Sequence, residues 1–209
     1  GTVTVIASTW KNDDSLYVGQ FGIGELSIEG RSNVSSKGSL IGHGQGSKGT
    51  VTITDSTWTN YAFLYVGNAG TGELTSADGG KVSSTFSHIG SRPGSKGTVT
   101  VTASTWENAG SLYVGNSGTG ELTIEKGGLV KTSGVFVGYN AASDTSPTAG
   151  NGTINLFGDS TSGRGVLEAA YVATGAGSAT LNLDGGILRA NRNEGNFLRN
   201  FGAVTPGLE

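Results

Sequence analysis

The chain of 209 residues has no cysteine and no methionine, and it has only two histidines and three prolines. Without cysteine, it can build neither a disulfide framework nor a thiol site. It has no run of 18 apolar residues and does not open with a basic-plus-apolar signal segment, so we expect no direct membrane insertion by this segment. The net charge of −3 is small and evenly spread. This argues against a nucleic-acid partner.

The absence of methionine also bears on how the chain was derived. The sequence opens on a repeat boundary at Gly1, which indicates a piece of a longer protein that continues upstream. The closing residues Leu208 and Glu209 look like a cloning remnant. No stretch carries an apolar stripe of helical period, so the sequence predicts an all-β chain.

The main feature of the sequence is an internal repeat. The segment GTVTVIASTW begins at Gly1, GTVTITDSTW at Gly49 and GTVTVTASTW at Gly97, which gives a period of 48 residues. Each period divides into two similar halves of about 24 residues. A fixed period of this size is typical of a stack in which each unit buries its apolar side against its neighbours.

The elementary unit of about 24 residues predicts short strands separated by glycine corners. Apolar residues alternate with Thr, Ser or Glu, as in Val3-Thr4-Val5, and glycine follows the strands. A hairpin array is the competing all-β arrangement, but the Asn-Gly and Asp-Gly turns that it needs are nearly absent. The sequence therefore predicts a right-handed parallel β-helix, or β-solenoid, of about eight rungs.

Two inward columns of apolar side chains follow from this alignment. The first is expected to contain Val3, Leu26, Val51, Leu74, Val99, Leu122, Ile154 and Leu181. The second is expected to contain Val18, Ile41, Val66, Ile89, Val114, Val137 and Val172. A third position alternates Trp10, Trp58 and Trp106 with Val34, Val82 and Val130. These tryptophans could stack on sugars, but a large residue above a smaller one also fills a core at native density, which we favour.

The regular repeats predict a single domain over residues 1–209 with three parts. Two-rung repeats cover residues 1–48, 49–96 and 97–138, and a protruding loop rich in small polar residues covers residues 139–151. Degenerate rungs and an end segment cover residues 152–209. The segment Asn196–Phe201 is expected to cover or continue the last rung. The repeat is interrupted at residues 139–151 and 193–209, and we expect any specific activity to lie in these segments.

Period two also predicts which side chains point outward. One outward column holds an aromatic strip, the candidate interaction site, which comprises Tyr17, Tyr65, His88, Tyr113, Phe136 and Tyr171, with Leu40 on the remaining rung. Such a strip is typical of an interaction surface, although aromatic stacking along a sheet explains it equally well. A second outward column alternates Thr-x-Thr with Glu-x-Thr or Glu-x-Ser. The interspersed Glu disfavours a flat ice-binding surface.

No catalytic residue, cofactor-binding residue or metal ligand is predicted, and we expect no enzyme activity. Glu25, Glu73 and Glu121 repeat on every second rung, about 10 Å apart, which is too far for a retaining glycosidase. The only other acidic region, with Asp144, Asp159, Glu168 and Asp184, shows no recognisable motif. The two histidines, His43 and His88, occupy different rung positions, and a metal site needs several convergent ligands.

The units STWxNxxSLYVGNxGxGELTI, with GGxV and VG, and the segment LNLDGGILRANRNEGNFLRNF resemble repeats of bacterial autotransporter passenger domains. The resemblance covers nearly the whole chain and is strongest over residues 1–138 and 177–201. It implies a secreted β-helix on the bacterial cell surface, tethered to the outer membrane by a barrel that this chain lacks. Many such passengers are virulence-associated adhesins or biofilm factors.

The resemblance implies a role in adhesion to a host-cell or extracellular-matrix component, or in self-association with like chains. Two other functions remain open on the sequence. One is a polysaccharide-active enzyme or binder that uses the region from Asp144 to Asp184. The other is an inert stalk that presents a binding domain located elsewhere.

Overall fold

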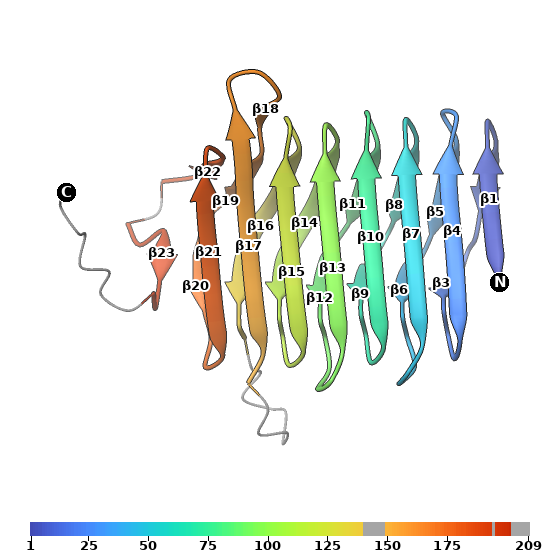
Figure 1. Cartoon of the computed structure of the whole chain (residues 1–209), viewed down its shortest axis with the longest axis horizontal. Coiled ribbons are helices and arrows are strands. Elements are labelled where there is room, and N and C mark those ends of the chain that lie inside the picture. Colours follow the sequence, from blue (N-terminus) through green and yellow to red (C-terminus); the bar gives the residue numbers. More distant parts are fainter. Residues whose placement is uncertain (140–148, 194, 202–209) are drawn as a thin grey trace.

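The computed structural model describes residues 1–139, 149–193 and 195–201, and this part of the chain consists of strands and turns without a helix. Parallel strands stack into a β-solenoid of about eight rungs, roughly 24 residues apart. Figure 1 shows the rungs side by side from the N-terminus to the C-terminus. The predicted all-β solenoid is confirmed.

Each complete rung contributes strands to three rows, which are named here in chain order. The first row consists of β1 (Thr2–Ile6), β4 (Ile23–Glu29), β7 (Lys48–Thr54), β10 (Thr71–Ala77), β13 (Lys96–Thr102), β15 (Thr119–Glu125), β17 (Asn151–Asp159) and β21 (Ser178–Asp184). The second row consists of β2 (Thr9–Lys11), β5 (Asn33–Ser36), β8 (Thr57–Asn60), β11 (Lys81–Ser84), the first halves of β14 (Thr105–Val114) and β16 (Leu129–Val137), β19 (Val166–Ala169) and β22 (Ile187–Ala190).

The third row consists of β3 (Ser15–Val18), β6 (Gly38–Ile41), β9 (Phe63–Val66), β12 (Phe86–Ile89), the second halves of β14 and β16, β20 (Val172–Thr174) and β23 (Leu198–Arg199). One short strand, β18 (Gly163–Arg164), pairs antiparallel with the end of β17. In Figure 1 the first row runs upward in front while the coil advances to the left, which makes the coil right-handed as predicted.

Backbone register confirms the first inward column rung by rung. Val3 pairs with Leu26, Leu26 with Val51, and the pairing continues to Ile154 and Leu181. The interior members are fully buried, Val51 and Leu122 at 0% exposure among them. Burying a side chain of this size contributes about 1.5–3 kcal/mol, so the stacked columns form one continuous core.

The second inward column is confirmed except at its last predicted member. Val18, Ile41, Val66, Ile89, Val114 and Val137 pair in sequence. The prediction for Val172 was wrong, because Val172 pairs with Val135, and Thr174 pairs with Val137. The strand is shifted by two residues relative to the prediction. A shift of two preserves which side chains face inward, so Val172 is still buried.

The tryptophans are core residues rather than sugar platforms. Trp58 is 0% exposed and Trp106 is 1% exposed, and they pair in register with the smaller Val82 and Val130. Trp10 on the first rung is only partly buried. The alternation of large and small residues therefore fills the interior as expected.

The two halves of the 48-residue period differ in their corners. A rung that contains Trp advances by 23 positions, from Val3 to Leu26, and the next advances by 25, from Leu26 to Val51. The longer rungs carry an extended corner between the third and first rows, such as Gly42–Ser47. In the third repeat the longer rung advances by 32 positions, from Leu122 to Ile154, instead of 25. The additional residues therefore lengthen a corner of the longer type.

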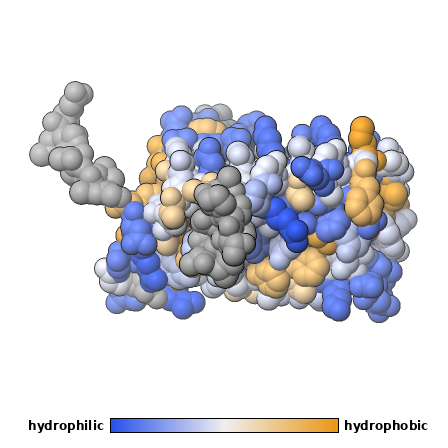
Figure 2. Space-filling model, turned by 90° about the horizontal axis from the view of Figure 1, so that it is seen from below, coloured by the Kyte–Doolittle hydropathy of each residue, from blue (hydrophilic) through white to orange (hydrophobic). Residues whose placement is uncertain are grey.

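That corner lies at the lower edge in Figure 1, and Figure 2 views the molecule from this side. In Figure 2, apolar side chains gather in separate patches among polar ones. The predicted protruding loop at residues 139–151 falls here, and its central part, 140–148, lies outside the described residues. Glycine begins each corner of this kind, as at Gly67 with φ +70°, where an added Cβ would collide with the Lys96 carbonyl.

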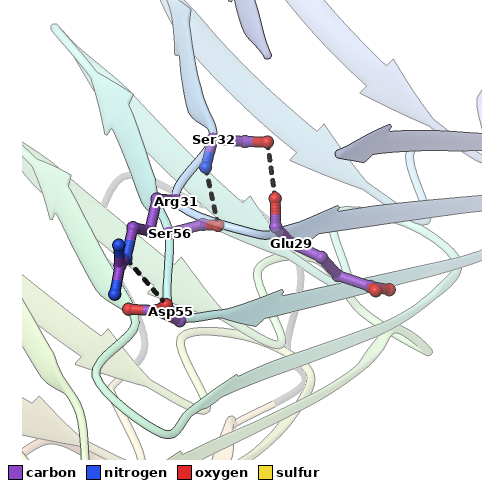
Figure 3. A network of polar contacts seen from close by, with 5 residues as sticks. All are labelled: Glu29, Arg31, Ser32, Asp55 and Ser56. Carbon is purple, nitrogen blue, oxygen red and sulfur yellow. Dashed lines mark hydrogen bonds and ion pairs between the residues drawn. The ribbon is translucent and has the colours of Figure 1, made fainter. Parts of the chain in front are cut away.

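Between the first and second rows, the corners are held by serines that bond from rung to rung. The Ser32 amide donates to Ser56 Oγ at 3.0 Å, and Ser32 Oγ donates to the Glu29 carbonyl at 2.6 Å (Figure 3). Beside them, the Arg31 guanidinium pairs with Asp55 at 3.5 Å. Side-chain oxygens thus satisfy backbone groups that a corner would otherwise leave unpaired.

A second polar column lies buried between the second and third rows. Its members are 24 positions apart and comprise Asn12, Ser36, Asn60, Ser84, Asn108 and Thr132. Asn108 is 2% exposed, accepts from Ser84 and Ser87, and donates to Thr132 and to the Gly110 carbonyl. The alternation of an amide with a hydroxyl keeps every Asn108 polar atom paired, as a buried polar group requires.

At the C-terminal end, the chain continues the solenoid and also covers it. Strand β23 pairs parallel with β20, so the segment Asn196–Phe201 continues the last rung. Phe197 and Phe201 pack against the core cluster. The prediction that this segment covers or continues the last rung is confirmed in both senses.

Candidate functional site

The outer side of the third row carries the aromatic strip predicted from the sequence. Backbone register aligns Tyr17, Leu40, Tyr65, His88, Tyr113 and Phe136 in one column. Tyr17 is 42% exposed, whereas Tyr65, His88, Tyr113 and Phe136 are partly buried. The structure therefore places these residues as expected, and their role in an interaction stays a prediction.

Two members of the column differ from the prediction. Leu40 is buried, with 6% exposure. Tyr171 lies opposite Gly134, and Ala173 is the residue that pairs with Phe136. The Tyr171 ring lies over Gly134, where a Cβ would collide with it. Tyr171 still reaches the strip, because its ring is 5.6 Å from that of Phe136.

Three consecutive rings of the strip stack on one another. His88 and Tyr113 have centroids 4.5 Å apart with planes 11° from parallel, and Tyr113 and Phe136 are 4.9 Å apart at 12°. These separations match the rung spacing of about 4.8 Å. The ring faces are therefore turned toward neighbouring rungs, and the ring edges are turned toward solvent.

A second outward column widens the strip, and sequence reasoning missed it. Phe63 and Phe86 lie two residues before Tyr65 and His88, and the Phe63 ring is 5.3 Å from that of Tyr65 and 6.1 Å from that of Phe86. Phe86 is 36% exposed. The signal was present, because period two sends residues two apart to the same side of a strand. Glycine at Gly38 provides the space that the Phe63 ring fills.

Hydroxyl groups gather beside the stacked rings on the fifth to seventh rungs. Tyr139, the first residue after Gly138 at the corner, has its ring 5.3 Å from that of Tyr113. Burial, followed by the nearby phenols of Tyr139 and Tyr171, raises the pKa of the Tyr113 hydroxyl, and a hydrogen bond from Ser111 opposes this. The Tyr113 hydroxyl is therefore protonated at neutral pH and able to donate.

Two arginines border the strip. The Arg199 guanidinium lies 4.0 Å from the centre of the Tyr171 ring, within the range of a cation–π contact. Burial raises the pKa of Tyr65, and the positive charge of Arg92, on the corner that follows β12 (Phe86–Ile89), partly offsets that rise.

His88 is the titratable group that the strip perturbs most clearly. Its ring lies between Tyr65, at 4.8 Å, and Tyr113. Burial lowers the pKa of His88 to about 4. Its buried Nδ1 has no hydrogen-bond partner in the part of the chain that the structure describes. His88 is therefore a neutral aromatic residue at physiological pH.

His43 lies at the adjoining corner and takes part in a different set of contacts. Its ring is 5.0 Å from that of Tyr17, and its Nδ1 lies 2.9 Å from the Asn68 amide nitrogen. The two histidines do not converge on one point. Among residues 1–139, 149–193 and 195–201, no cluster of His, Cys, Asp and Glu could hold a metal ion.

The repeat-related glutamates of the first row are surface acids with separate partners. A threonine rung separates each pair, as Thr50 separates Glu25 from Glu73. Lys48 pairs with Glu73 at 3.2 Å, and the Asn155 amide donates to Glu121 at 3.0 Å. No two of these carboxylates face each other across a space where a substrate could lie.

Among the other acidic residues considered from the sequence, Asp159 and Glu168 have separate local partners. Asp144 lies outside the described residues. Backbone and side-chain hydrogen bonds from Ser162, and one from Thr161, lower the pKa of Asp159 and hold its carboxylate in a local turn. Glu168 pairs with Arg189 at 3.4 Å on the second row.

A shallow polar cleft lies near the end of the second row. It measures about 440 Å³ and is lined by Glu107, Lys131, Glu168, Arg192 and the buried polar column. Charges of both signs alternate along it. This cleft is a second surface, besides the aromatic strip, on which a ligand could be recognised.

Comparisons with known proteins identify no relative of this chain. No family model, no curated protein and no solved structure matches it. In the described part of the chain, no helix is present that could cross a lipid bilayer.

Proposed function

We propose that this chain is a non-catalytic segment of a bacterial surface passenger of the autotransporter type that mediates adhesion or self-association. The observation that carries this proposal is the contiguous aromatic strip on the third row of a rigid rod. The rings are in unbroken contact from Tyr65 to Tyr171, and Phe63 and Phe86 join them from the neighbouring column. Tyr17 lies two rungs before Tyr65, beyond the buried Leu40. Contiguous apolar surface of this kind marks interaction sites more often than scattered residues do.

A repeated surface on a rod supports binding through many weak contacts. Rungs follow one another at about 4.8 Å, so a partner aligned with the axis meets similar groups at regular intervals. Once one contact has formed, the next is intramolecular, and the total affinity exceeds that of any single contact. The partner would be a host-cell or extracellular-matrix component, or another copy of the chain.

The proposal is tested by removing rings from the strip while leaving the core in place. Bacteria or beads that display the chain with Tyr17, Tyr65, Tyr113 and Tyr171 replaced by serine should attach to cells, matrix or one another several-fold less than those with the unmodified chain. A matched control replaces Thr4, Thr52, Thr100 and Thr123 on the first row with serine. If the variant remains folded by circular dichroism and attaches as well as the unmodified chain, the strip is not the attachment surface.

The polar cleft supports a second candidate, a polysaccharide-active enzyme or binder. Glu107 and Glu168 both line it, with Lys131 on the rung between them, so they lie about 10 Å apart. That separation is nearer to the inverting than to the retaining arrangement of glycosidase carboxylates. Cleavage of neutral or uronic-acid polysaccharides, abolished by Glu168→Gln, would favour this candidate over adhesion. A pure stalk would be inert in both assays.

A further inference from the structure

Hollows on the second row join into one groove that runs along the rod axis. A hollow of about 400 Å³, lined by Lys81, shares Ser83 and Glu107 with the polar cleft of about 440 Å³. A smaller hollow of about 260 Å³ shares Thr57 and Lys81 with the first. The groove therefore passes across successive strands of the second row, from β8 to β16, instead of following any one of them.

Three exposed charges of alternating sign lie in this groove on successive rungs. Lys81, Glu107 and Lys131 are on the fourth, fifth and sixth rungs, and Glu107 lines both the 400 Å³ hollow and the cleft. Within residues 1–139, 149–193 and 195–201, none of the three forms an ion pair. By contrast, Glu168 on the seventh rung is already paired with Arg189. The three central charges are therefore available to a ligand.

The lining between these charges is polar. The buried side chains of Asn108 and Thr132 line the cleft, and the half-buried Thr105 lines the adjoining hollow. None of the residues that line the cleft or the 400 Å³ hollow is aromatic. A ligand in the groove therefore meets hydroxyl, amide and charged groups and finds no ring on which to stack.

The spacing along the groove distinguishes between two kinds of extended polymer. The two lysines lie two rungs apart, about 10 Å along the axis, with the glutamate on the rung between them. Side chains on one face of an extended peptide recur at about 7 Å, which does not match. Because the groove crosses the strands, a peptide backbone lying in it cannot pair with a strand edge. One sugar of a β-linked polysaccharide is close in length to one rung, so alternate sugars can meet alternate charges.

A second copy of the chain fits the groove less well, although its charges alternate in the same way. Its second row is hollowed at the same places. Two such surfaces placed face to face would leave unfilled space between them, whereas stable interfaces are packed as closely as protein interiors. The occupant has to be narrower than the rod, as a single extended polymer is.

We propose that the second row binds a zwitterionic polysaccharide, in which sugars that carry an amino group alternate with sugars that carry a carboxylate. The ammonium group of one sugar pairs with Glu107, and the carboxylates of the two flanking sugars pair with Lys81 and Lys131 through charge-assisted hydrogen bonds. This proposal rests on the second candidate function, a polysaccharide binder at the cleft, and is independent of attachment through the aromatic strip.

The test compares three polymers of matched length in mildly acidic buffer, where amino groups on sugars are protonated. N-deacetylated hyaluronan alternates carboxylate with ammonium, unmodified hyaluronan carries carboxylates alone, and chitosan carries ammonium groups alone. Titration calorimetry should show that the purified chain binds N-deacetylated hyaluronan about tenfold more tightly than the other two, because only this polymer pairs with all three charges. Added salt should weaken that binding.

Substitutions at the charged residues should change the affinities for the two hyaluronans in different directions. Glu107→Gln should weaken binding of N-deacetylated hyaluronan about tenfold, because a charge-assisted hydrogen bond is lost. It should strengthen binding of unmodified hyaluronan, because a repulsion between carboxylates is removed. Lys131→Gln should weaken binding of both. The matched control, Glu29→Gln, removes the same charge from an exposed position of the first row and should leave both affinities unchanged.

Equal binding of the three polymers, or equal effects of Glu107→Gln and Glu29→Gln, would overturn the zwitterionic ligand while leaving a polysaccharide binder at the cleft in place. Tighter binding of a peptide that alternates lysine with glutamate would overturn the choice of a polysaccharide. Self-association of the chain that is lost in Glu107→Gln would assign the groove to a second copy instead. Failure to bind any polysaccharide would also overturn the second candidate function, with attachment through the strip unaffected.

Discussion

The first and third rows share one rung spacing and one core, yet their outer sides differ in kind. The first row presents threonine on one rung and glutamate on the next, each hydrated or paired with a neighbour such as Lys48. The third row presents stacked aromatic rings and no carboxylate in its described strands. The comparison shows that the repeat constrains the inward positions, whereas outward positions on each row are free to specialise.

Substitutions at inward positions should have the largest effect on the free energy of unfolding, and the effect should be the same in both rows. Leu122 in the first row and Leu64 in the third are both 0% exposed. Replacing either with alanine should lower the free energy of unfolding by about 2–5 kcal/mol, since each leaves a cavity that neighbouring rungs cannot close. Chemical denaturation measures both. A loss below about 1 kcal/mol on only one row would show that the rows do not share a core.

The second largest loss of stability is expected from the buried polar column between the second and third rows. Asn108→Ala removes the acceptor that the Ser84 and Ser87 hydroxyls share, so that only one of the two can still donate, to the other. It also removes one of the two donors to the Gly110 carbonyl. Buried groups left unpaired cost about 1–3 kcal/mol each, so we expect a loss of about 2–3 kcal/mol after local rearrangement. The control is Asn33→Ala at an exposed position of the second row. Comparable losses in the two variants would contradict the role of the column.

The third row should make stability sensitive to acid through His88. Burial lowers its folded pKa to about 4, below the ordinary value of about 6.5. The unfolded chain therefore takes up a proton first, and stability is lost as pH falls from about 6.5 to about 4. The facing phenols of Tyr65 and Tyr113, whose pKa values burial raises, stay protonated over this range.

The size of the acid effect is about 2–3 kcal/mol, from the difference between the two pKa values. Denaturation at pH 7 and pH 4 measures it. His88→Phe, which keeps the ring stack, should remove that part of the pH dependence. An unchanged slope in His88→Phe would show that another group is responsible.

Sequence reasoning went wrong on the third row where it relied on residue type. Val172 resembles the valines of the inward column and was aligned with Val137. The spacing would have corrected this, because Val34 precedes Ile41 by seven positions and Leu167 precedes Thr174 by the same number. Likewise, Phe63 and Phe86 occupy outward positions that period two identifies. Their joining with the strip depends on ring orientation, which no spacing specifies.

By itself, the sequence determined the rung, the two inward columns, the tryptophan core and the outward side of the strip. These follow from a period of two within strands and of about 24 between rungs, because burying apolar surface leaves few alternative registers. Only the tertiary structure decided that ring edges face solvent, that Arg199 lies over Tyr171 and that His88 is enclosed. Those properties arise between side chains on different rungs, where packing selects among rotamers that the sequence leaves equally available.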